Sequence, residues 1–229
     1  MQGQERFPLR ASKENVTGGI FWILTLEFFV GQVIAQVGWR GLPSYSPISD
    51  AISNLGVTVC GMVKIGGVSG YYCSPLHDVM NASFILAGVF MLLGLYLTRS
   101  SFHSNRSTRA GAVLLAIAGL GKITVGLNPA NVDFTLHFLG ALGIPVAGVG
   151  MIFSGRGFRG KVGWLANLSE ILGVIGLIGF ILFLFTSRSG IGGLTERIAD
   201  YPMFVWFATM GFLFLSHASK EEGKGEKRR

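Results

Sequence analysis

Charged residues are scarce in this chain, and their scarcity argues against an ordinary soluble domain. Only 14% of the 229 residues are Asp, Glu, Lys or Arg, whereas soluble domains carry about 25%. Long stretches hold almost no charge, and the charges collect between them, which is typical of membrane spans joined by short loops. The net charge of +7 does not indicate nucleic-acid binding. The basic residues lie in short clusters between apolar runs, where they orient a protein in the bilayer.

Cysteine is nearly absent, and both cysteines fall in one loop, residues 40–78. A lone pair such as Cys60 and Cys73 favours a disulfide if its loop faces an oxidising compartment. Two free thiols or a metal pair are the alternatives, although a structural zinc site normally needs four ligands. A bridge would close a loop of about 14 residues and stabilise the fold by about 3 kcal/mol in the chain-entropy model. Gly66 and Gly67 indicate that this loop is otherwise flexible.

Long apolar runs are the dominant feature of what is present. They cover residues 18–39, 79–97, 110–127, 136–153, 162–185 and 201–216. Each approaches the ~20 residues that a helix needs to cross a ~30 Å hydrocarbon core. The runs are continuous rather than alternating, which favours helices over membrane strands. The sequence therefore predicts an all-α, polytopic transmembrane bundle of six helices. The first run is too long for a signal peptide and lacks a clear cleavage site, so we expect it to be retained.

The distribution of Lys and Arg predicts the orientation of this bundle. Fourteen basic residues flank one side of the predicted spans: Arg6, Arg10, Lys13, Arg99, Arg106, Arg109, Arg156, Arg159, Lys161, Lys220, Lys224, Lys227, Arg228 and Arg229. Four flank the other side: Arg40, Lys64, Arg188 and Arg197. The positive-inside rule then predicts a cell-membrane protein with both termini in the cytoplasm. We expect a cytoplasmic tail at 1–17, a membrane domain at 18–217 with loop 40–78 outside, and a disordered cytoplasmic tail at 218–229.

A faint internal repeat appears when the chain is compared with itself at an offset of 60 residues. Leu-His pairs at 76–77 and 136–137 coincide, as do Ala-Gly-Val triplets at 87–89 and 147–149. The match indicates a parallel repeat of the first two hairpins, as in some transporter folds. Chance coincidence is the alternative, because Gly and Ala are common in membrane helices.

Two charged residues lie deep inside predicted spans, and the repeat places them opposite each other. Glu27 belongs to the first span and Lys122 to the third. A charge at the bilayer centre costs at least ~2.5–3.5 kcal/mol on insertion scales and is by default a functional hypothesis. The two side chains are either a buried pair that locks the first and third helices or a ligand or proton site. A lysine that extends outward to the interface is a further alternative.

Polar and ionisable groups also gather at the predicted outer ends of the helices. They comprise Ser49, Asp50, Ser53, Asn54, His77, Asp78, Asn81, Asn128, Asp133, His137, Glu196 and Arg197. Three outer loops thus deliver such groups to one end of the bundle. The ligand-binding candidates of the whole chain are Glu27, Asp50, His77, Asn81, Lys122, Asp133, His137 and Arg197.

A metal site at this end is the less favoured hypothesis. His77, Asp133 and His137 are residue types that bind Zn²⁺, which could activate a water molecule. No helix carries an HExxH motif or paired histidines at ligand spacing. Asp133 also fits a helix N-cap. We therefore predict no cofactor and keep zinc as an alternative.

Three short motifs carry a family resemblance. They are Ser-Asp-Ala-Ile-Ser-Asn-Leu-Gly at 49–56, His137 at the start of the fourth helix, and Gly-Leu-Thr-Glu-Arg-Ile at 193–198. The chain, from about residue 18 to 217, resembles the prokaryotic six-helix membrane proteins grouped as domain of unknown function 998. The resemblance implies six helices and an outward-facing polar cluster, and it brings no catalytic residue. The cysteine pair and its extended loop depart from the pattern.

Three functions remain open at this point. We favour binding or transport of a lipid or small amphiphile through a polar site at the outer leaflet, with Glu27 and Lys122 lining a cavity. An intramembrane metal-assisted hydrolase or transferase acting on lipid headgroups is the alternative, and it needs the histidines and carboxylates to converge. A structural or assembly partner would instead show a filled outer mouth and an exposed face of small residues. Membrane lipid is the expected partner, and the sequence leaves the oligomeric state open.

Overall fold

The structure is a computed structural model that describes residues 12–102 and 105–226, with side chains for 12–101 and 105–218. Its helices are α1 (Lys13–Leu24), α2 (Glu27–Val37), α3 (His77–Leu97), α4 (Arg99–Phe102), α5 (Arg106–Leu127), α6 (Phe134–Ala141), α7 (Gly143–Phe158), α8 (Gly163–Thr186) and α9 (Gly192–Glu226). A short 3-10 helix, η1 (Ile52–Gly56), and two strands, β1 (Gly61–Ile65) and β2 (Val68–Tyr72), lie between α2 and α3.

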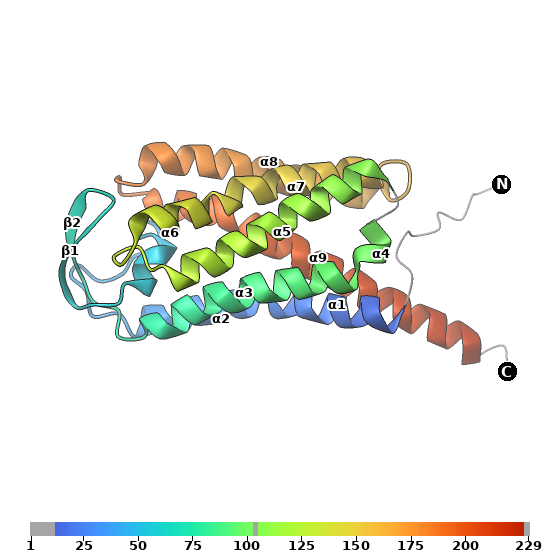
Figure 1. Cartoon of the computed structure of the whole chain (residues 1–229), viewed down its shortest axis with the longest axis horizontal. Coiled ribbons are helices and arrows are strands. Elements are labelled where there is room, and N and C mark those ends of the chain that lie inside the picture. Colours follow the sequence, from blue (N-terminus) through green and yellow to red (C-terminus); the bar gives the residue numbers. More distant parts are fainter. Residues whose placement is uncertain (1–11, 103–104, 227–229) are drawn as a thin grey trace.

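The long helices run lengthwise beside one another in a single bundle (Figure 1). Among the described residues, 6 segments are long and apolar enough to cross a membrane. They are Lys13–Val37, His77–Leu97, Arg106–Leu127, Phe134–Phe158, Gly163–Thr186 and Gly192–Ala218. The prediction of an all-α bundle of six spans is therefore confirmed.

The sixth span differs from its predicted bounds at both ends. The apolar run suggested a start at Tyr201, but α9 begins at Gly192 and takes Glu196 and Asp200 into the bundle. A prediction from apolar runs excluded this first part of the helix, because Glu196 and Asp200 interrupt the run. The helix also continues to Glu226, beyond the expected end at Ser216 and into residues predicted to form a disordered tail.

Two spans are interrupted, and the causes can be read from the sequence. The first breaks between α1 and α2, where the Thr25 hydroxyl donates to the Trp22 carbonyl at 2.6 Å. The fourth breaks at Leu142, three residues before Pro145, which has no N–H to offer the carbonyl four residues earlier. In α9, Pro202 lies inside the helix and leaves a carbonyl of the preceding turn without its usual donor.

The loop between α2 and α3 contains a β-hairpin that the sequence analysis did not predict. Strands β1 and β2 pair antiparallel, with Ile65 opposite Val68. The turn residues Gly66 and Gly67 have φ of 56° and 88°. Two positive φ values in a row are what a type I′ turn requires, so the glycines make a defined turn rather than a flexible segment. The predicted disulfide between Cys60 and Cys73 is present at the base of this hairpin.

The rest of this loop is fixed to the ends of the helices. Leu55 in η1 is fully buried, and the Ser74 hydroxyl donates to its carbonyl at 2.7 Å. The Asn81 side chain on α3 donates to the Gly56 carbonyl at 2.9 Å. We call this the hairpin end of the bundle (Figure 1).

The opposite end, which we call the basic end, carries the clustered cations of the described chain: Lys13, Arg99, Arg106, Arg109, Arg156, Arg159 and Lys161. Its interior is filled by aromatic rings. Trp22 is fully buried, with ring centroids 5.4 Å from Phe207, 5.8 Å from Phe214 and 6.1 Å from Trp206. The Trp206 indole N–H donates to the Ser169 hydroxyl at 2.8 Å, so the polar atom of this ring is also satisfied. This half of the bundle is consequently well packed.

The residues that suggested an internal repeat have a packing role. A Cβ on Gly88 would collide with the Gly119 carbonyl of α5, and a Cβ on Gly148 would lie 3.0 Å from the Gly173 carbonyl of α8. Each glycine therefore lets its helix approach the next span closely. This requirement accounts for the matching Ala-Gly-Val triplets without a duplication, and the repeat stays a prediction.

Candidate functional site

Two cavities lie one beneath the other at the hairpin end. The larger one, which we call the hairpin-end pocket, has a volume of about 290 Å³. It approaches the range of small-molecule sites, about 300–1,000 Å³. The smaller inner cavity has a volume of about 20 Å³, enough for a single water molecule by the usual threshold of roughly 10–15 Å³. The hairpin end therefore contains room for a ligand group, with a hydratable space beneath it.

The walls of the hairpin-end pocket are largely apolar and come from separate helices. Phe134 and Phe138 line it from α6, and Phe180, Phe183 and Leu184 line it from α8. The hairpin contributes a third wall through Ile65, Gly66, Val68 and Tyr72. Arg188 lies at the exposed rim and donates to the Gly66 carbonyl at 3.0 Å. A long apolar group entering between α6 and α8 would meet rings on both sides.

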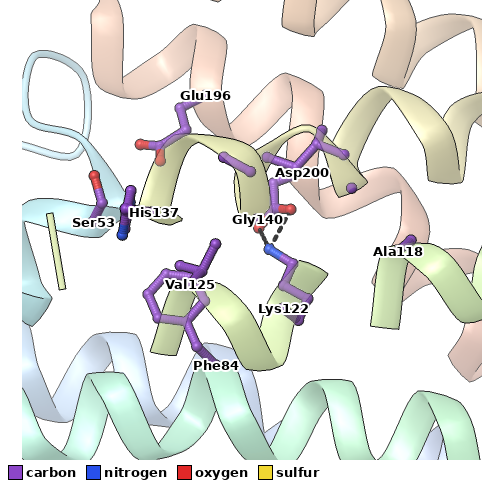
Figure 2. Close-up of a pocket in the computed structure, with 12 residues that line it drawn as sticks. Ser53, Phe84, Ala118, Lys122, Val125, His137, Gly140, Glu196 and Asp200 are labelled. Carbon is purple, nitrogen blue, oxygen red and sulfur yellow. Dashed lines mark hydrogen bonds and ion pairs between the residues drawn. The ribbon is translucent and has the colours of Figure 1, made fainter. Parts of the chain in front are cut away.

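Polar side chains line the floor, where the two cavities adjoin. Ser53, His137 and Glu196 border both cavities. Figure 2 shows the Glu196 carboxylate directed toward Ser53 and His137, whereas Lys122 and Asp200 point toward each other on the other side of the view. These residues come from η1, α5, α6 and α9, so the fold brings together groups that are far apart in the sequence.

The inner cavity is bordered by a buried ion pair between α5 and α9. The Lys122 Nζ lies 2.5 and 2.7 Å from the two carboxylate oxygens of Asp200. The two side chains are 5% and 2% exposed. Both charges are thus nearly desolvated, and each depends on the other for compensation.

Three phenylalanine rings complete the surroundings of the Lys122 ammonium. Its Nζ lies 4.9 Å from the ring centroid of Phe28, 5.2 Å from that of Phe84 and 5.3 Å from that of Phe204. Phe28 and Phe204 are themselves stacked with centroids 4.5 Å apart. Ring faces attract a desolvated cation. The positive charge of Lys122 is therefore held by one carboxylate and three aromatic rings.

Glu196 lies one helical turn before Asp200 on α9 and has no comparable partner. It is 9% exposed, and its Oε2 accepts a hydrogen bond from the Ile52 backbone N–H at 2.5 Å. Among the residues that the structure describes, no Lys or Arg side chain forms an ion pair with it. A buried carboxylate at the floor of the pocket is thus left without an ion-pair partner in the described part of the chain.

Arg197, the neighbour of Glu196, binds the loop instead. Its guanidinium donates to the carbonyls of Pro47 at 2.8 Å, Asp50 at 3.0 Å and Gly193 at 2.9 Å, and to the Tyr45 hydroxyl at 2.6 Å. Burial raises the pKa of the Tyr45 hydroxyl, against the opposing effect of the Arg197 charge. Tyr45 therefore keeps its proton and donates it to the Ala51 carbonyl at 3.0 Å.

The same contact brings together two of the motifs that the sequence analysis singled out. The Gly193 N–H donates to the Ser49 carbonyl at 3.2 Å, and the Leu194 N–H donates to the Ile48 carbonyl at 2.8 Å. A side chain at Gly193 would collide with the backbone of Asp50. Residues 49–56 and 193–198 thus dock on each other, and His137, the third motif, borders the cavities beside them.

Of the alternatives for Glu27 and Lys122, a buried pair between the two is not formed, because Lys122 binds Asp200. Glu27 Oε2 instead accepts from the Ser83 hydroxyl at 2.9 Å, and Oε1 is buried without a hydrogen-bond partner among the described residues. Lys122 borders the inner cavity, whereas Glu27 lines neither of the two cavities. Asp200 was missed because it stands one residue before the apolar run. Its spacing of four from Glu196 was the available signal, since it places both carboxylates on one face of a helix.

The predicted metal ligands do not gather at one point. His77 Nδ1 lies 2.8 Å from the Ser74 carbonyl oxygen, and its ring lies against the exposed Asp78. Asp133 caps α6 by accepting from the Leu136 N–H at 2.9 Å, as its N-cap position suggested. His137 Nδ1 lies 2.9 Å from the Asn128 carbonyl oxygen. Within residues 12–101 and 105–218, no group of three or more His, Cys, Asp or Glu side chains is arranged to hold a metal ion.

The remaining candidates, Asp50 and Asn81, contact the backbone of the loop. Asp50 Oδ2 accepts from the Ser46 N–H at 2.8 Å, and Asn81 donates to the Gly56 carbonyl as described above. Together with Arg197, these side chains hold the hairpin end in place. Of the eight ligand-binding candidates, His137 borders both cavities and Lys122 borders the inner one.

Six apolar spans around a polar floor define a multi-pass membrane protein. The family model described as Protein of unknown function (DUF998) matches residues 25–213, and the chain belongs to this family. The matched segment includes the three motifs on which the resemblance rests. No curated protein and no solved structure gives a significant match to the chain.

Proposed function

We propose that the protein binds a lipid or small amphiphile in the hairpin-end pocket. The pocket itself carries the proposal: about 290 Å³ of space with rings of α6 and α8 on two walls and Ser53, His137 and Glu196 at the floor. An amphiphile would place its polar group at this floor and its chain between the two helices. Ligand sites of this kind combine apolar walls with a few polar groups that fix orientation.

The proposed location is the outer leaflet of the cell membrane. The cationic side chains at the basic end favour a cytoplasmic position by the positive-inside rule. The hairpin end, with its disulfide, would then face an oxidising compartment in which a disulfide persists. Both arguments support a position of the pocket on the same, non-cytoplasmic side.

Binding is supported more directly than transport. The rings around Trp22 and Trp206 fill the basic half of the bundle, so passage through it would require the spans to move apart. The breaks in the first and fourth spans, near Thr25 and Leu142, are features that transporters use for such movements. We therefore propose binding as the primary role. A flux assay would be needed to demonstrate transport.

The other two functions receive less support from the same residues. A hydrolase or transferase needs a nucleophile in hydrogen-bond reach of a base. Ser53, His137 and Glu196 make no such bond with one another among the described residues. A purely structural partner would have a filled mouth, whereas this one contains the hairpin-end pocket.

Native mass spectrometry of the protein purified in mild detergent tests the proposal. We expect wild type to retain a co-purified lipid or amphiphile at near one-to-one stoichiometry. Ser187→Trp, which narrows the pocket at an exposed position, should lose most of it. Ser216→Trp, at a serine that is also exposed but lies at the basic end of α9, is the matched control and should retain the ligand. Equal ligand retention by both variants would contradict the proposal. So would a wild-type protein that carries no ligand after purification and binds no added lipid.

A further inference from the structure

We propose that the ligand's head group carries an amine, and that its ammonium pairs with Glu196. This inference rests on the proposed function and specifies the chemical class of the amphiphile. It begins from an imbalance of charge at the floor of the pocket, where a carboxylate more than nine-tenths buried has no cationic partner.

The cations nearest in the sequence and the fold are already engaged. Lys122 is bound by both oxygens of Asp200, so this pair is neutral as a unit. Arg197 directs its guanidinium to backbone carbonyls and the Tyr45 hydroxyl on the loop. Arg188 is exposed at the rim and donates to Gly66, where solvent screens its charge. Within the described residues, none of them forms an ion pair with Glu196.

The position of Glu196 suits a ligand cation. Its Oε2 is fixed by the Ile52 N–H, which orients the carboxylate before any ligand arrives. The side chain borders the hairpin-end pocket and the inner cavity together, and its carboxylate is directed toward Ser53 and His137 (Figure 2). Oε1 has no hydrogen-bond partner among the described residues. An ammonium at the floor would give this oxygen a charge-assisted hydrogen bond.

The burial of the Glu196 carboxylate makes a pair with a ligand ammonium favourable. An isolated carboxylate in a low-dielectric interior is strongly disfavoured, and it either takes up a proton or acquires a counter-ion. An amphiphile with an anionic head group would add a second negative charge beside Glu196. An alcohol head group would leave the carboxylate uncompensated. An ammonium removes the imbalance in one contact.

The aromatic walls favour the same class of ligand. Phe134, Phe138, Phe180 and Phe183 surround the pocket above the floor. Ring faces stabilise ammonium groups that have left water. The protein already uses this chemistry one layer deeper, where three phenylalanine rings and a carboxylate hold the Lys122 ammonium. The hairpin-end pocket offers the same kinds of group, a carboxylate and several phenylalanine rings, without a resident cation.

Three probes of one chain length test the inference: tetradecylamine, tetradecanol and tetradecanoic acid, each titrated into purified protein near neutral pH. Binding is measured by native mass spectrometry, with the thermal shift as a second readout. We expect wild type to bind the amine about tenfold more tightly than the alcohol, which corresponds to about 1.4 kcal/mol and is close to the lower limit for a hydrogen bond to a charged group. The acid should bind most weakly.

Glu196→Gln should remove this preference, so that the variant binds the amine no more tightly than the alcohol. Glutamine keeps an oxygen for the Ile52 N–H, so the variant conserves the loop contact. Asp78→Asn is the matched control, because Asp78 is a carboxylate at the same end that is 93% exposed. It should preserve the preference for the amine. If Glu196→Gln does not fold, the ranking of the three probes in wild type decides.

The outcomes separate the two proposals. Equal affinity for the three probes in wild type, reduced by Ser187→Trp, overturns the amine assignment and leaves amphiphile binding in place. A preference for the amine that survives Glu196→Gln overturns the role of Glu196. Binding of all three probes that is unaffected by Ser187→Trp overturns the proposed function itself.

Discussion

The basic half of the bundle is filled by aromatic rings, whereas the hairpin half leaves two cavities among charged side chains. At the basic end, Trp22 is fully buried and packs on three further rings. At the hairpin end, aromatic and aliphatic side chains also form the walls, yet the floor carries a buried carboxylate that forms no ion pair with the described residues. Burying such a group lowers stability unless something compensates it. From this contrast we expect the basic half to contribute most to stability and the hairpin half to hold the proposed ligand.

The largest expected effect comes from the ion pair at the boundary between the halves. Asp200→Ala leaves the Lys122 ammonium buried without its carboxylate and should destabilise the fold by about 3–5 kcal/mol. Lys122→Met combined with Asp200→Leu removes both charges and should recover most of that loss, because a buried pair can often be replaced by apolar residues of similar volume. Thermal unfolding in mild detergent, followed by size-exclusion chromatography, measures both variants.

An exposed ion pair at the basic end provides the control. Arg159 and Glu170 form a bidentate pair on the surface, with side chains 65% and 20% exposed. Glu170→Gln should shift the unfolding temperature far less than Asp200→Ala, because solvent screens an exposed pair. Equal shifts would show that the Lys122–Asp200 pair is not the buried contact described above.

The next effect separates stability from binding. Trp22→Ala should destabilise the fold by about 3 kcal/mol, the lower end for a buried aromatic residue, since Phe207 and Phe214 can relax into the space. The folded fraction should still bind amphiphile as wild type does, because Trp22 lies outside the pocket lining. Unfolding temperature and native mass spectrometry on one sample check both parts. If the folded Trp22→Ala variant does not bind amphiphile, the basic half also contributes to binding, and the proposed division of roles between the two halves is wrong.

The smallest effect concerns the docking of the two motifs. Gly193→Ala places a Cβ against the Asp50 backbone and should destabilise the fold by about 1–3 kcal/mol through overpacking. The loop carries Ser53 and the Ile52 N–H that donates to Glu196. The folded fraction of Gly193→Ala should therefore also retain less ligand than wild type. Gly190→Ala is the matched control, because a Cβ there meets open space. If Gly193→Ala retains as much ligand as Gly190→Ala does, the contact between the two motifs does not contribute to binding.

The architecture could be predicted from the sequence because a membrane span is a local signal. Six apolar runs of adequate length fixed the helices without knowledge of any contact. The bounds of the sixth span failed for the same reason, since Glu196 and Asp200 interrupt the apolar run but not the helix. The hairpin also had a local signal, the Gly66–Gly67 pair, which was interpreted as flexibility instead of a turn.

The site could be predicted only in part, because its contacts join residues distant in the sequence. Lys122 was correctly identified as a buried charge, but its partner lies 78 residues away on α9. Arg197 and Asp50 were correctly placed at one end of the bundle, yet their role in holding the loop depends on a contact across 147 residues. The residue type and its depth in a predicted span identify candidate site residues. Their interaction partners depend on how distant segments pack together, which the sequence alone does not show.

The central claim is that an amphiphile occupies the hairpin-end pocket with its chain between α6 and α8. A photoactivatable amphiphile with an amine head group and a diazirine in its chain, cross-linked to wild-type protein and mapped by peptide mass spectrometry, tests this most directly. We predict adducts on Phe138, Phe183 and Leu184, and their loss in Ser187→Trp. Adducts concentrated on the membrane-facing groove lined by Ile117, Leu139 and Val146, unchanged in that variant, would contradict the account.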